Sequence, residues 1–312
     1  INKNFIPFGP KRDEIFIDAT FGAGGHSLAL LKSAECRIIA LDRDPNVIES
    51  AKELLSKFAP RLCLLHRSFS ELHSVAREVG ENSVNGVLLD IGLSSMQIDD
   101  PSRGFSFQKD GPLDMRMSGV GQTASNVVNT YPDDQLTRIF LSLGEERHAR
   151  RIARAITQQR LIKKFGSTKE LADLVVRVVG GRKRGEIHPA TKIFQALRIY
   201  INDELNELKK GLLAAEQILK PEGRLVVITF HSLEDRVVKQ FLRSRSGIMD
   251  HGSRYKPSPE LRISPPSFRI INPRPLTPNK DELEVNPRAR SALLRAAQRT
   301  HAPIWEEPKE II

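Results

Sequence analysis

The chain has 312 residues and a mass of 35.0 kDa, enough for one large or two modest folding units with a substantial buried core. Apolar residues make up 39% and charged residues 28%, and no stretch approaches the roughly 18 uncharged apolar residues of a membrane helix, which excludes a membrane-spanning protein. The 48 Lys and Arg against 38 Asp and Glu give a net charge of +10, which permits a polyanionic partner.

The N-terminal part of the chain alternates short apolar, β-branched runs with helix-like stretches, a pattern typical of a parallel sheet built from βαβ units. The predicted strands cover residues 14–20, 37–44, 62–69 and 84–92. Apolar residues at helical spacing after Pro45 predict a helix over residues 46–58.

The strand pattern stops over residues 101–185, which are turn-rich and then helical, and this indicates an insertion. A helix over residues 202–219 then leads into a fifth strand over residues 224–230, where the sheet resumes. Residues 250–290 are rich in proline and are predicted to wrap an existing surface. The fold class is therefore α/β, with a mostly parallel sheet and an inserted helical domain.

A glycine-rich loop follows the first predicted strand in the segment that begins at Asp18 and ends at Ser27. Gly22, Gly24 and Gly25 stand where a backbone turns sharply and approaches a ligand closely, which favours a nucleotide-type loop over a simple tight turn. Ser27 occupies the position of the last glycine of the dinucleotide fingerprint, which weakens a pyrophosphate-binding interpretation.

Aspartates end the second and fourth predicted strands. Asp42 is placed to accept hydrogen bonds from both hydroxyls of a ribose, whereas Asp44 before Pro45 is better suited to capping the next helix. Asp90 is a candidate for contact with the cofactor's amino-acid part or with the reacting group, because α/β sheets bind ligands at the carboxyl ends of their strands.

Two further strand ends carry residues that serve either a site or the fold. Phe69 ends the third predicted strand and either covers an adenine face or belongs to the core. His231 follows the fifth strand at a helix start, where it faces the same crevice or has a purely structural role.

Positive charge is concentrated in the predicted insertion, where residues 147–184 contain twelve Lys and Arg against two acidic residues. Helical spacing places apolar residues on one face and an arginine stripe on the opposite face, which fits a phosphate backbone better than a solvated surface with no interleaved acids. The stripe comprises Arg147, Arg150, Arg151 and Arg154, and a second basic cluster comprises Arg182, Lys183 and Arg184.

Taken as a whole, the chain resembles the S-adenosylmethionine-dependent small-subunit ribosomal RNA (cytosine-N4)-methyltransferases, the MraW/RsmH family. The matching segments span nearly the whole chain in order, and the full series is highly specific. They include the segment from Asp18 to Ser27, Leu-Asp-Arg-Asp-Pro45, Leu-Leu-Asp-Ile-Gly-Leu-Ser-Ser95, Gly111-Pro-Leu-Asp-Met-Arg-Met117, His188-Pro-Ala-Thr191, Phe230-His-Ser-Leu-Glu-Asp235 and Asn286-Pro-Arg-Ala-Arg-Ser291.

The resemblance implies a class I (Rossmann-like) methyltransferase domain over residues 1–102 and 200–312, interrupted by a helical domain over residues 103–199 that helps to recognise RNA. It implies S-adenosyl-L-methionine as the cofactor and no metal. The residues it implies for cofactor binding are Gly24, Gly25, His26, Asp42, Phe69, Asp90 and Gln97.

The resemblance also implies a partner, the small-subunit ribosomal RNA or an immature small ribosomal subunit, and no membrane. Residues 1–12 depart from the start of bacterial members, which makes the chain look more like the mitochondrial member that serves the 12S rRNA. We therefore expect the mitochondrial matrix, with a bacterial cytoplasm as the alternative. The two cysteines cannot form a disulfide framework, which agrees with a reducing compartment, and nothing indicates the oligomeric state.

Methyl transfer to cytosine N4 requires an acceptor for an N–H proton, and Asp90 is the first candidate, with His231 and Asp114 as alternatives. Two rival functions stay open from the sequence. An NAD-dependent oxidoreductase would have the same sheet and Asp42, but that function would not explain the basic insertion. A catalytically silent RNA-binding assembly factor would need the arginines but would not need an intact glycine loop.

Overall fold

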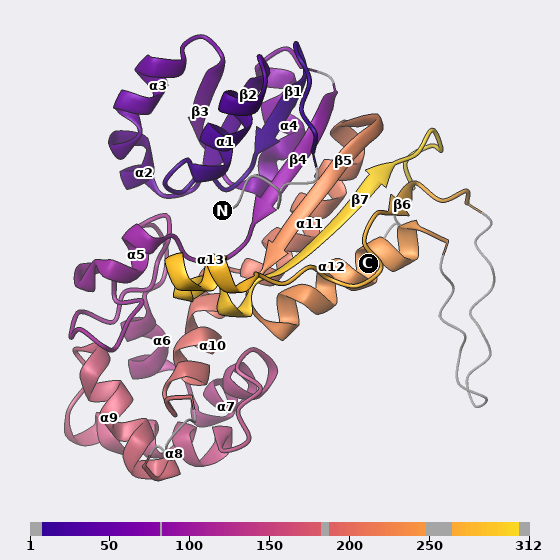
Figure 1. Cartoon of the computed structure of the whole chain (residues 1–312). Helices are drawn as coiled ribbons and strands as arrows, with labels where there is room; N and C mark the ends of the chain where they lie inside the picture. Colours follow the sequence, from indigo (N-terminus) through magenta and orange to yellow (C-terminus); the bar gives the residue numbers. More distant parts are fainter. Residues whose placement is uncertain (1–7, 82, 182–186, 248–263, 306–312) are drawn as a thin grey trace, which may run out of the picture. The chain divides into compact units, whose positions relative to one another are not determined.

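The structure is a computed structural model that describes residues 8–81, 83–181, 187–247 and 264–305 (Figure 1). The chain divides into two compact units. One, the sheet unit, combines Ile1–Gly92 with Glu207–Ile312, and the other, the helical unit, comprises Leu93–Asn206. Within the described residues, every helix is too short or too polar to cross a membrane.

The sheet unit is built on seven described strands in the order β3-β2-β1-β4-β5-β7-β6. The pairs from β3 to β5 are parallel, and β7 joins β5 and β6 by antiparallel pairing. The strands are β1 (Ile15–Asp18), β2 (Arg37–Asp42), β3 (Leu62–His66), β4 (Val84–Asp90), β5 (Leu219–Thr229), β6 (Phe268–Ile270) and β7 (Leu293–Arg299). The mostly parallel α/β sheet that the sequence predicted is thus confirmed.

Helices cover this sheet because consecutive apolar residues in a buried strand point to opposite faces. The helical segments of the unit are α1 (Gly25–Ser33), α2 (Pro45–Ser50), α3 (Lys52–Phe58), η2 (Phe69–Glu71), α4 (Leu72–Glu78), α11 (Glu204–Ile218, whose first turn belongs to the helical unit), α12 (Ser232–Arg245), α13 (Lys280–Val285) and η4 (Pro287–Ser291).

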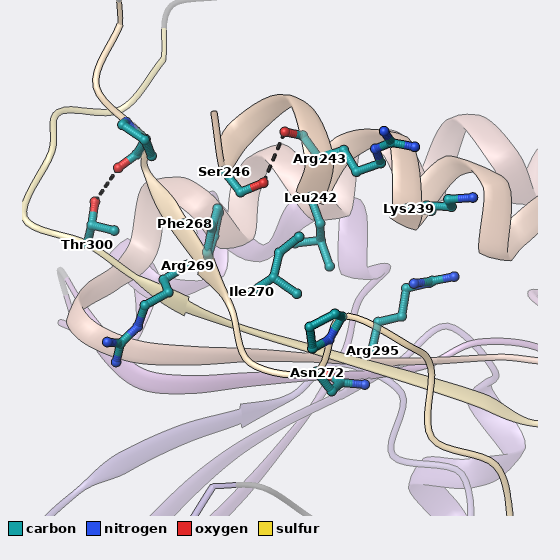
Figure 2. A pocket seen from close by; sticks show the side chains of 12 residues that line it. Lys239, Leu242, Arg243, Ser246, Phe268, Arg269, Ile270, Asn272, Arg295 and Thr300 are labelled. Carbon is teal, nitrogen blue, oxygen red and sulfur yellow. Dashed lines mark hydrogen bonds between the residues drawn. The ribbon is translucent and has the colours of Figure 1, made fainter. Parts of the chain in front are cut away.

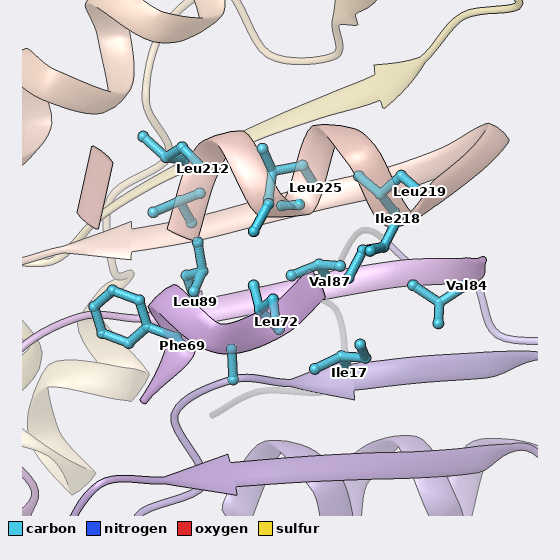
Figure 3. Close-up of a cluster of buried hydrophobic side chains, with 14 of the residues drawn as sticks. Ile17, Phe69, Leu72, Val84, Val87, Leu89, Leu212, Ile218, Leu219 and Leu225 are labelled. Carbon is cyan, nitrogen blue, oxygen red and sulfur yellow. The ribbon is translucent and has the colours of Figure 1, made fainter. Parts of the chain in front are cut away.

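Two buried clusters lie on the two faces of the sheet. Ile17 and Leu89 belong to the cluster that includes side chains of α4 and α11 (Figure 3). Their sequence neighbours Phe16 and Leu88 belong to the cluster that includes side chains of α1 and α2. All four side chains are at most 2% exposed, and fully burying one such side chain stabilises the fold by about 1.5–3 kcal/mol.

The helical unit has its own core, with Leu136, Phe140, Ile152, Val175 and Leu197 fully buried. Its helical segments are α5 (Ser95–Asp99), η3 (Pro101–Arg103), α6 (Ala124–Thr130), α7 (Asp133–Ser142), α8 (Ala149–Ile162), α9 (Thr168–Val179) and α10 (Thr191–Ile201).

The unit extends beyond residues 103–199, the range predicted for the insertion. Leu93 packs against the core of the helical unit, so the unit begins shortly after the end of β4 and before residue 103. At the other boundary the Asn202 side chain accepts a hydrogen bond from the Met117 backbone at 2.8 Å and donates one to the Met115 carbonyl at 2.8 Å. These buried contacts place the end of α10 in the helical unit.

Two predicted elements differ from the structure. The helix predicted over residues 46–58 is divided into α2 and α3 at Ala51, where ψ is near zero. Residues 250–290, predicted only to wrap a surface, contain β6 and α13, and β6 extends the sheet by pairing with β7. The alternating pattern of a three-residue edge strand is too short to be read from the sequence.

Candidate active site

The glycine-rich loop leads from β1 into α1 and needs glycine at a specific position. Gly24 is the N-cap of α1 and has a left-handed backbone, with φ of 74°. A Cβ atom at Gly24 would lie 2.6 Å from Cζ of Phe21 and 2.8 Å from a methyl carbon of Leu54. A Cβ atom at Gly25 would meet nothing within 4 Å, so the backbone of the first helical residue faces open space that a ligand can approach.

Asp18, at the end of β1, holds this loop in place. Its fully buried carboxylate accepts a hydrogen bond from the Ser27 hydroxyl at 2.7 Å and one from the Thr20 backbone at 3.3 Å. The Thr20 hydroxyl in turn accepts the backbone N–H of Asp90 at 2.7 Å, which joins the loop to β4. Neither role could be predicted from the sequence, although Asp18 and Thr20 lie within the loop motif, because the sequence does not show which side chains turn inward.

Asp42 lies at the end of β2, directly beside the loop. Its Oδ2 atom accepts the Gly22 backbone N–H at 2.8 Å, and its Oδ1 atom accepts the Asp44 backbone N–H at 2.9 Å. Each carboxylate oxygen keeps a second lone pair that can accept a ribose hydroxyl. Asp44 caps α2 through a hydrogen bond from Asn46, as the sequence predicted.

Asp90, at the end of β4, pairs with His26 in the first turn of α1. The Nε2 atom of His26 lies 3.0 Å from Oδ2 of Asp90. The other polar atom of each side chain, His26 Nδ1 and Asp90 Oδ1, is buried and has no hydrogen-bond partner among the described residues. Because buried polar atoms are rarely left unsatisfied, this adjacent pair fits a ligand that carries both an acceptor and a donor.

Burial and neighbouring charges shift the pKa values of three of these side chains. Burial lowers the pKa of His26, but the hydrogen bond that its ring donates to Asp90 and the charges of Asp90 and Asp18 outweigh this effect, so the pKa is raised. Burial raises the pKa of Asp18 against the opposing influence of His26. Burial also raises the pKa of Asp42, although the backbone N–H groups of Asp44 and Gly22 oppose the shift. A protonated His26 would present Nδ1 as a hydrogen-bond donor.

Phe69 and His231 are held by contacts within the fold. The Phe69 ring is 9% exposed and packs against Gly211 of α11, where a Cβ atom would lie 2.7 Å from the ring. His231 is the N-cap of α12, and its Nδ1 atom accepts the Glu234 backbone N–H at 3.3 Å while Nε2 lies 2.8 Å from the Glu234 carboxylate. The Nε2 atom of His231 makes no hydrogen bond among the described residues despite this proximity. Because Nδ1 accepts the backbone N–H, a neutral ring carries its proton on Nε2, and neither nitrogen then offers a lone pair for a further proton.

Comparison with known proteins decides the family, because residues 2–300 match the MraW methylase family. The chain belongs to the MraW methylase family. This membership confirms the methyltransferase class and the S-adenosyl-L-methionine cofactor that the sequence predicted.

Bacterial relatives named "Ribosomal RNA small subunit methyltransferase H" align with nearly the whole MraW methylase chain. The protein of Paramagnetospirillum magneticum is 50% identical over 297 residues, covering 95% of this chain and 93% of its own. The Bradyrhizobium diazoefficiens protein is 52% identical, with 96% and 89% covered, and that of Bartonella henselae is 54% identical, with 92% and 80% covered. A solved putative rRNA methylase from Clostridium thermocellum shares 10% identity with a TM-score of 0.43, and the alignment covers 95% of this chain and 94% of that chain.

The helical unit of the methylase contains the remaining two residues predicted for cofactor binding or catalysis. Gln97 is buried in α5, where its side chain accepts the Ser94 backbone N–H at 3.0 Å in a capping box. Asp114 forms a bidentate pair with Arg116, at 2.9 and 2.7 Å. Burial raises the pKa of Asp114, but the hydrogen bonds and charge of Arg116 outweigh it, so the pKa is lowered and Asp114 is a weak proton acceptor.

The arginine stripe of the methylase lies on and just before α8. Arg150, Arg151 and Arg154 are exposed on this helix, and Arg147 is exposed two residues before it begins. The opposite face is fully buried, as the spacing predicted. None of the four forms an ion pair with a described carboxylate, so their charges stay available to an anion. Arg182, Lys183 and Arg184 lie outside the described residues.

Proposed function

We propose that the protein transfers a methyl group from S-adenosylmethionine to N4 of a specific cytidine in small-subunit ribosomal RNA. One observation carries the proposal, the pair of unsatisfied buried atoms at Asp90 and His26 beside the glycine loop. S-adenosylmethionine carries an α-amino acid, whose ammonium group suits the Asp90 acceptor and whose carboxylate suits a protonated His26.

The remaining cofactor contacts follow from the same edge of the sheet. Asp42 accepts the ribose hydroxyls, and the exposed backbone at Gly25 approaches the amino-acid part closely. Gln97 in the helical unit is a further proposed cofactor contact. Phe69 in the sheet unit is another, and its small exposed part would meet an adenine.

S-adenosylmethionine supplies an electrophilic methyl group on a positively charged sulfur. The protein's main contribution is to hold cytosine N4 in line with that methyl group, about 3 Å away. N4 is a poor nucleophile because its lone pair is delocalised into the ring, so an acceptor for an N4 hydrogen localises the pair and receives the proton. We assign that acceptor to Asp90, because a carboxylate oxygen has two lone pairs and its Oδ1 atom can accept a second hydrogen bond beside the ammonium group. By contrast, Nδ1 of His231 already accepts a backbone N–H, and both carboxylate oxygens of Asp114 accept hydrogen bonds from Arg116.

The proposed RNA-recognition element is the helical unit with its arginine stripe on α8. Four exposed arginines that pair with none of the described carboxylates resemble a phosphate-binding surface, and phosphate contacts position a strand without reading its sequence. The basic cluster formed by Arg182, Lys183 and Arg184 is proposed as an extension of that surface.

The cellular compartment, and with it the source of the RNA, is proposed separately from the reaction. The sequence predicts mitochondrial 12S rRNA as the substrate, but the relatives named above are bacterial and give that setting no support. The proposal therefore names the small-subunit rRNA, with the mitochondrial matrix and the bacterial cytoplasm as the two settings to be tested.

The decisive experiment incubates the protein and isotopically labelled S-adenosylmethionine with immature small subunits from bacteria and, separately, from mitochondria. Mass spectrometry then maps the modified base. We expect one N4-methylcytidine in one of the two RNAs. RNA binding without methyl incorporation would instead favour the catalytically silent assembly factor.

Replacing the proposed proton acceptor tests the mechanism separately. We expect Asp90→Asn to lower the rate of methyl transfer by about 10²–10⁴-fold at saturating cofactor, the range typical of general acid–base catalysis. Asp114→Asn, measured in parallel, should keep most of the rate. The reverse result would move the proton acceptor from the sheet unit to the helical unit.

A further inference from the structure

A groove of about 640 Å³ lies on the sheet unit between α12 and the strands β6 and β7 (Figure 2). We call it the α12–β7 groove. Its volume falls within the roughly 300–1,000 Å³ of typical small-ligand sites. None of its lining residues belongs to the glycine loop or to the ends of β1, β2 and β4.

The floor of the groove is apolar and well packed. Leu242 from α12 and Phe268 and Ile270 from β6 form it, and the first two are only 3% and 1% exposed (Figure 2). Such a floor is a hydrocarbon surface against which a planar ring can pack, and its side chains carry no polar group that would need a hydrogen-bond partner.

The rim of the groove is positively charged. Lys239 and Arg243 lie one turn apart on α12, and Arg295 on β7 points toward the same end of the groove (Figure 2). Arg295 is held by a bidentate pair with Asp235 at 2.7 and 2.9 Å, whereas Lys239 forms no ion pair with a described carboxylate. None of the described residues that line the groove is acidic, so the rim attracts an anion.

A buried network fixes the walls of the groove before any ligand binds. The Glu216 carboxylate of α11 accepts two hydrogen bonds. One comes from the Arg245 guanidinium of α12 at 2.9 Å, and the other comes from the hydroxyl of Ser267, next to β6, at 2.5 Å. Arg299 of β7 donates to the Glu216 carbonyl at 3.3 Å and to the Ser267 carbonyl at 3.0 Å. These bonds hold α12, β6 and β7 together, which lowers the entropy that binding would cost.

We propose that the α12–β7 groove binds one nucleotide of the RNA substrate strand at a distance from the methylated cytidine, with a phosphate on Lys239 and Arg243 and the base against Ile270. This proposal rests on the proposed RNA substrate. A single-stranded nucleotide combines an anion with a flat, largely apolar body, and the groove offers complements to both. An acidic peptide would match the rim but not the floor.

The test measures binding of a fluorescent 12-nucleotide single-stranded oligouridylate to the full chain by anisotropy. The groove variant is Lys239→Gln with Arg243→Gln. The matched control is Lys52→Gln with Lys57→Gln, which removes the same charge from exposed positions on α3 of the same unit. We expect the groove variant to bind about fivefold to tenfold more weakly and the control to change less than about twofold.

A second measurement identifies the contact directly. The oligonucleotide is made with 4-thiouridine and cross-linked by light, and mass spectrometry should find the cross-link on residues 239–246 or 266–273 of the wild-type protein. Equal binding by both variants, or a cross-link found only elsewhere, overturns the proposal. Competition by uridine monophosphate as strong as by the oligonucleotide would show a mononucleotide site, and equal competition by polyglutamate would show an acidic-peptide site, and each result also overturns it.

Failure of the groove and failure of the proposed function give different results. If the groove proposal is wrong but the function is right, the groove variant methylates small-subunit RNA like wild type. If the function is wrong, the wild-type protein incorporates no methyl group into any small-subunit RNA, whatever the oligonucleotide shows.

Discussion

Charged side chains are placed in opposite ways in two regions, the arginine stripe and the strand-end site, which we define as Asp18, Asp42 and Asp90 with His26. At the ends of β1, β2 and β4 the charged side chains are largely buried, and each is hydrogen-bonded to its own loop or to a neighbouring charge. The arginines of the stripe are exposed, and none of them forms an ion pair with a carboxylate among the described residues. A buried, fixed charge suits one small ligand in one orientation, whereas exposed charges suit a polyanion and are screened by salt.

The largest expected effect on cofactor binding is at Asp42, and it tests whether the strand-end site holds a ribose. A hydrogen bond to a charged group is worth about 1.5–3 kcal/mol, so losing two in Asp42→Ala should weaken S-adenosylmethionine binding by more than about 100-fold. Isothermal titration calorimetry measures this loss, and a thermal melt shows whether the variant is folded. Glu49→Gln, an exposed change on α2, serves as the control. Undiminished affinity in Asp42→Ala would remove the ribose contact from the proposal.

The two glycines of the loop separate the fold from cofactor binding. A left-handed residue with a side chain costs about 1–2 kcal/mol, and in Gly24→Ala the clash with Phe21 adds to this cost. We expect denaturant unfolding to show that loss of stability. Gly25→Ala should leave stability unchanged or raise it by up to about 1 kcal/mol.

Gly25→Ala should nevertheless weaken S-adenosylmethionine binding by about tenfold, because its methyl group enters the open space beside the backbone. Normal cofactor affinity in Gly25→Ala would show that the cofactor does not approach this residue.

The arginine stripe should make the affinity for RNA depend strongly on salt concentration. For single strands each neutralised phosphate contributes about 0.7 to the slope of log affinity against log salt, so replacing Arg150, Arg151 and Arg154 with glutamine should reduce the slope by about 2. Binding of a small-subunit RNA fragment is measured across a range of salt concentrations.

The matched control for the stripe removes three cations of the helical unit that are already paired with carboxylates. These are Arg138 with Asp134, Lys163 with Glu170 and Lys169 with Asp173. Their replacement by glutamine should change the slope much less. Equal slopes for the two triple variants would mean that only total charge matters.

The smallest expected effect is a pH dependence of stability that arises from His26. Its pKa is raised in the folded protein, so protonation stabilises the fold fully below the unfolded pKa of about 6.5, and this contribution is lost as the pH rises through the folded pKa. The difference in unfolding free energy between wild type and His26→Gln should therefore shrink with rising pH. In an Asp90→Asn background the difference should vary less with pH, and a pH-independent difference in both backgrounds would contradict the pairing.

Much of the strand-end site could be predicted because its signals are local. The positions of Asp42 and Asp90 at the ends of strands follow from apolar runs that stop at an acidic residue, and the need for glycine follows from a turn between a strand and a helix. The roles of His231 and Asp114 could not be judged in this way, since their partners, Glu234 and Arg116, bind them through side-chain orientations that the sequence pattern does not contain.

The sequence by itself determined the α/β class, the parallel strands from β1 to β5, the presence of an inserted helical unit and the arginine face of α8, because each depends on periodicity within one segment. Only the tertiary structure decided that Asp18 and Thr20 support the loop, that β6 and β7 complete the sheet, and that α12 and β7 enclose a basic groove. These features depend on residues far apart in the chain that meet through packing, and no local pattern specifies such a meeting.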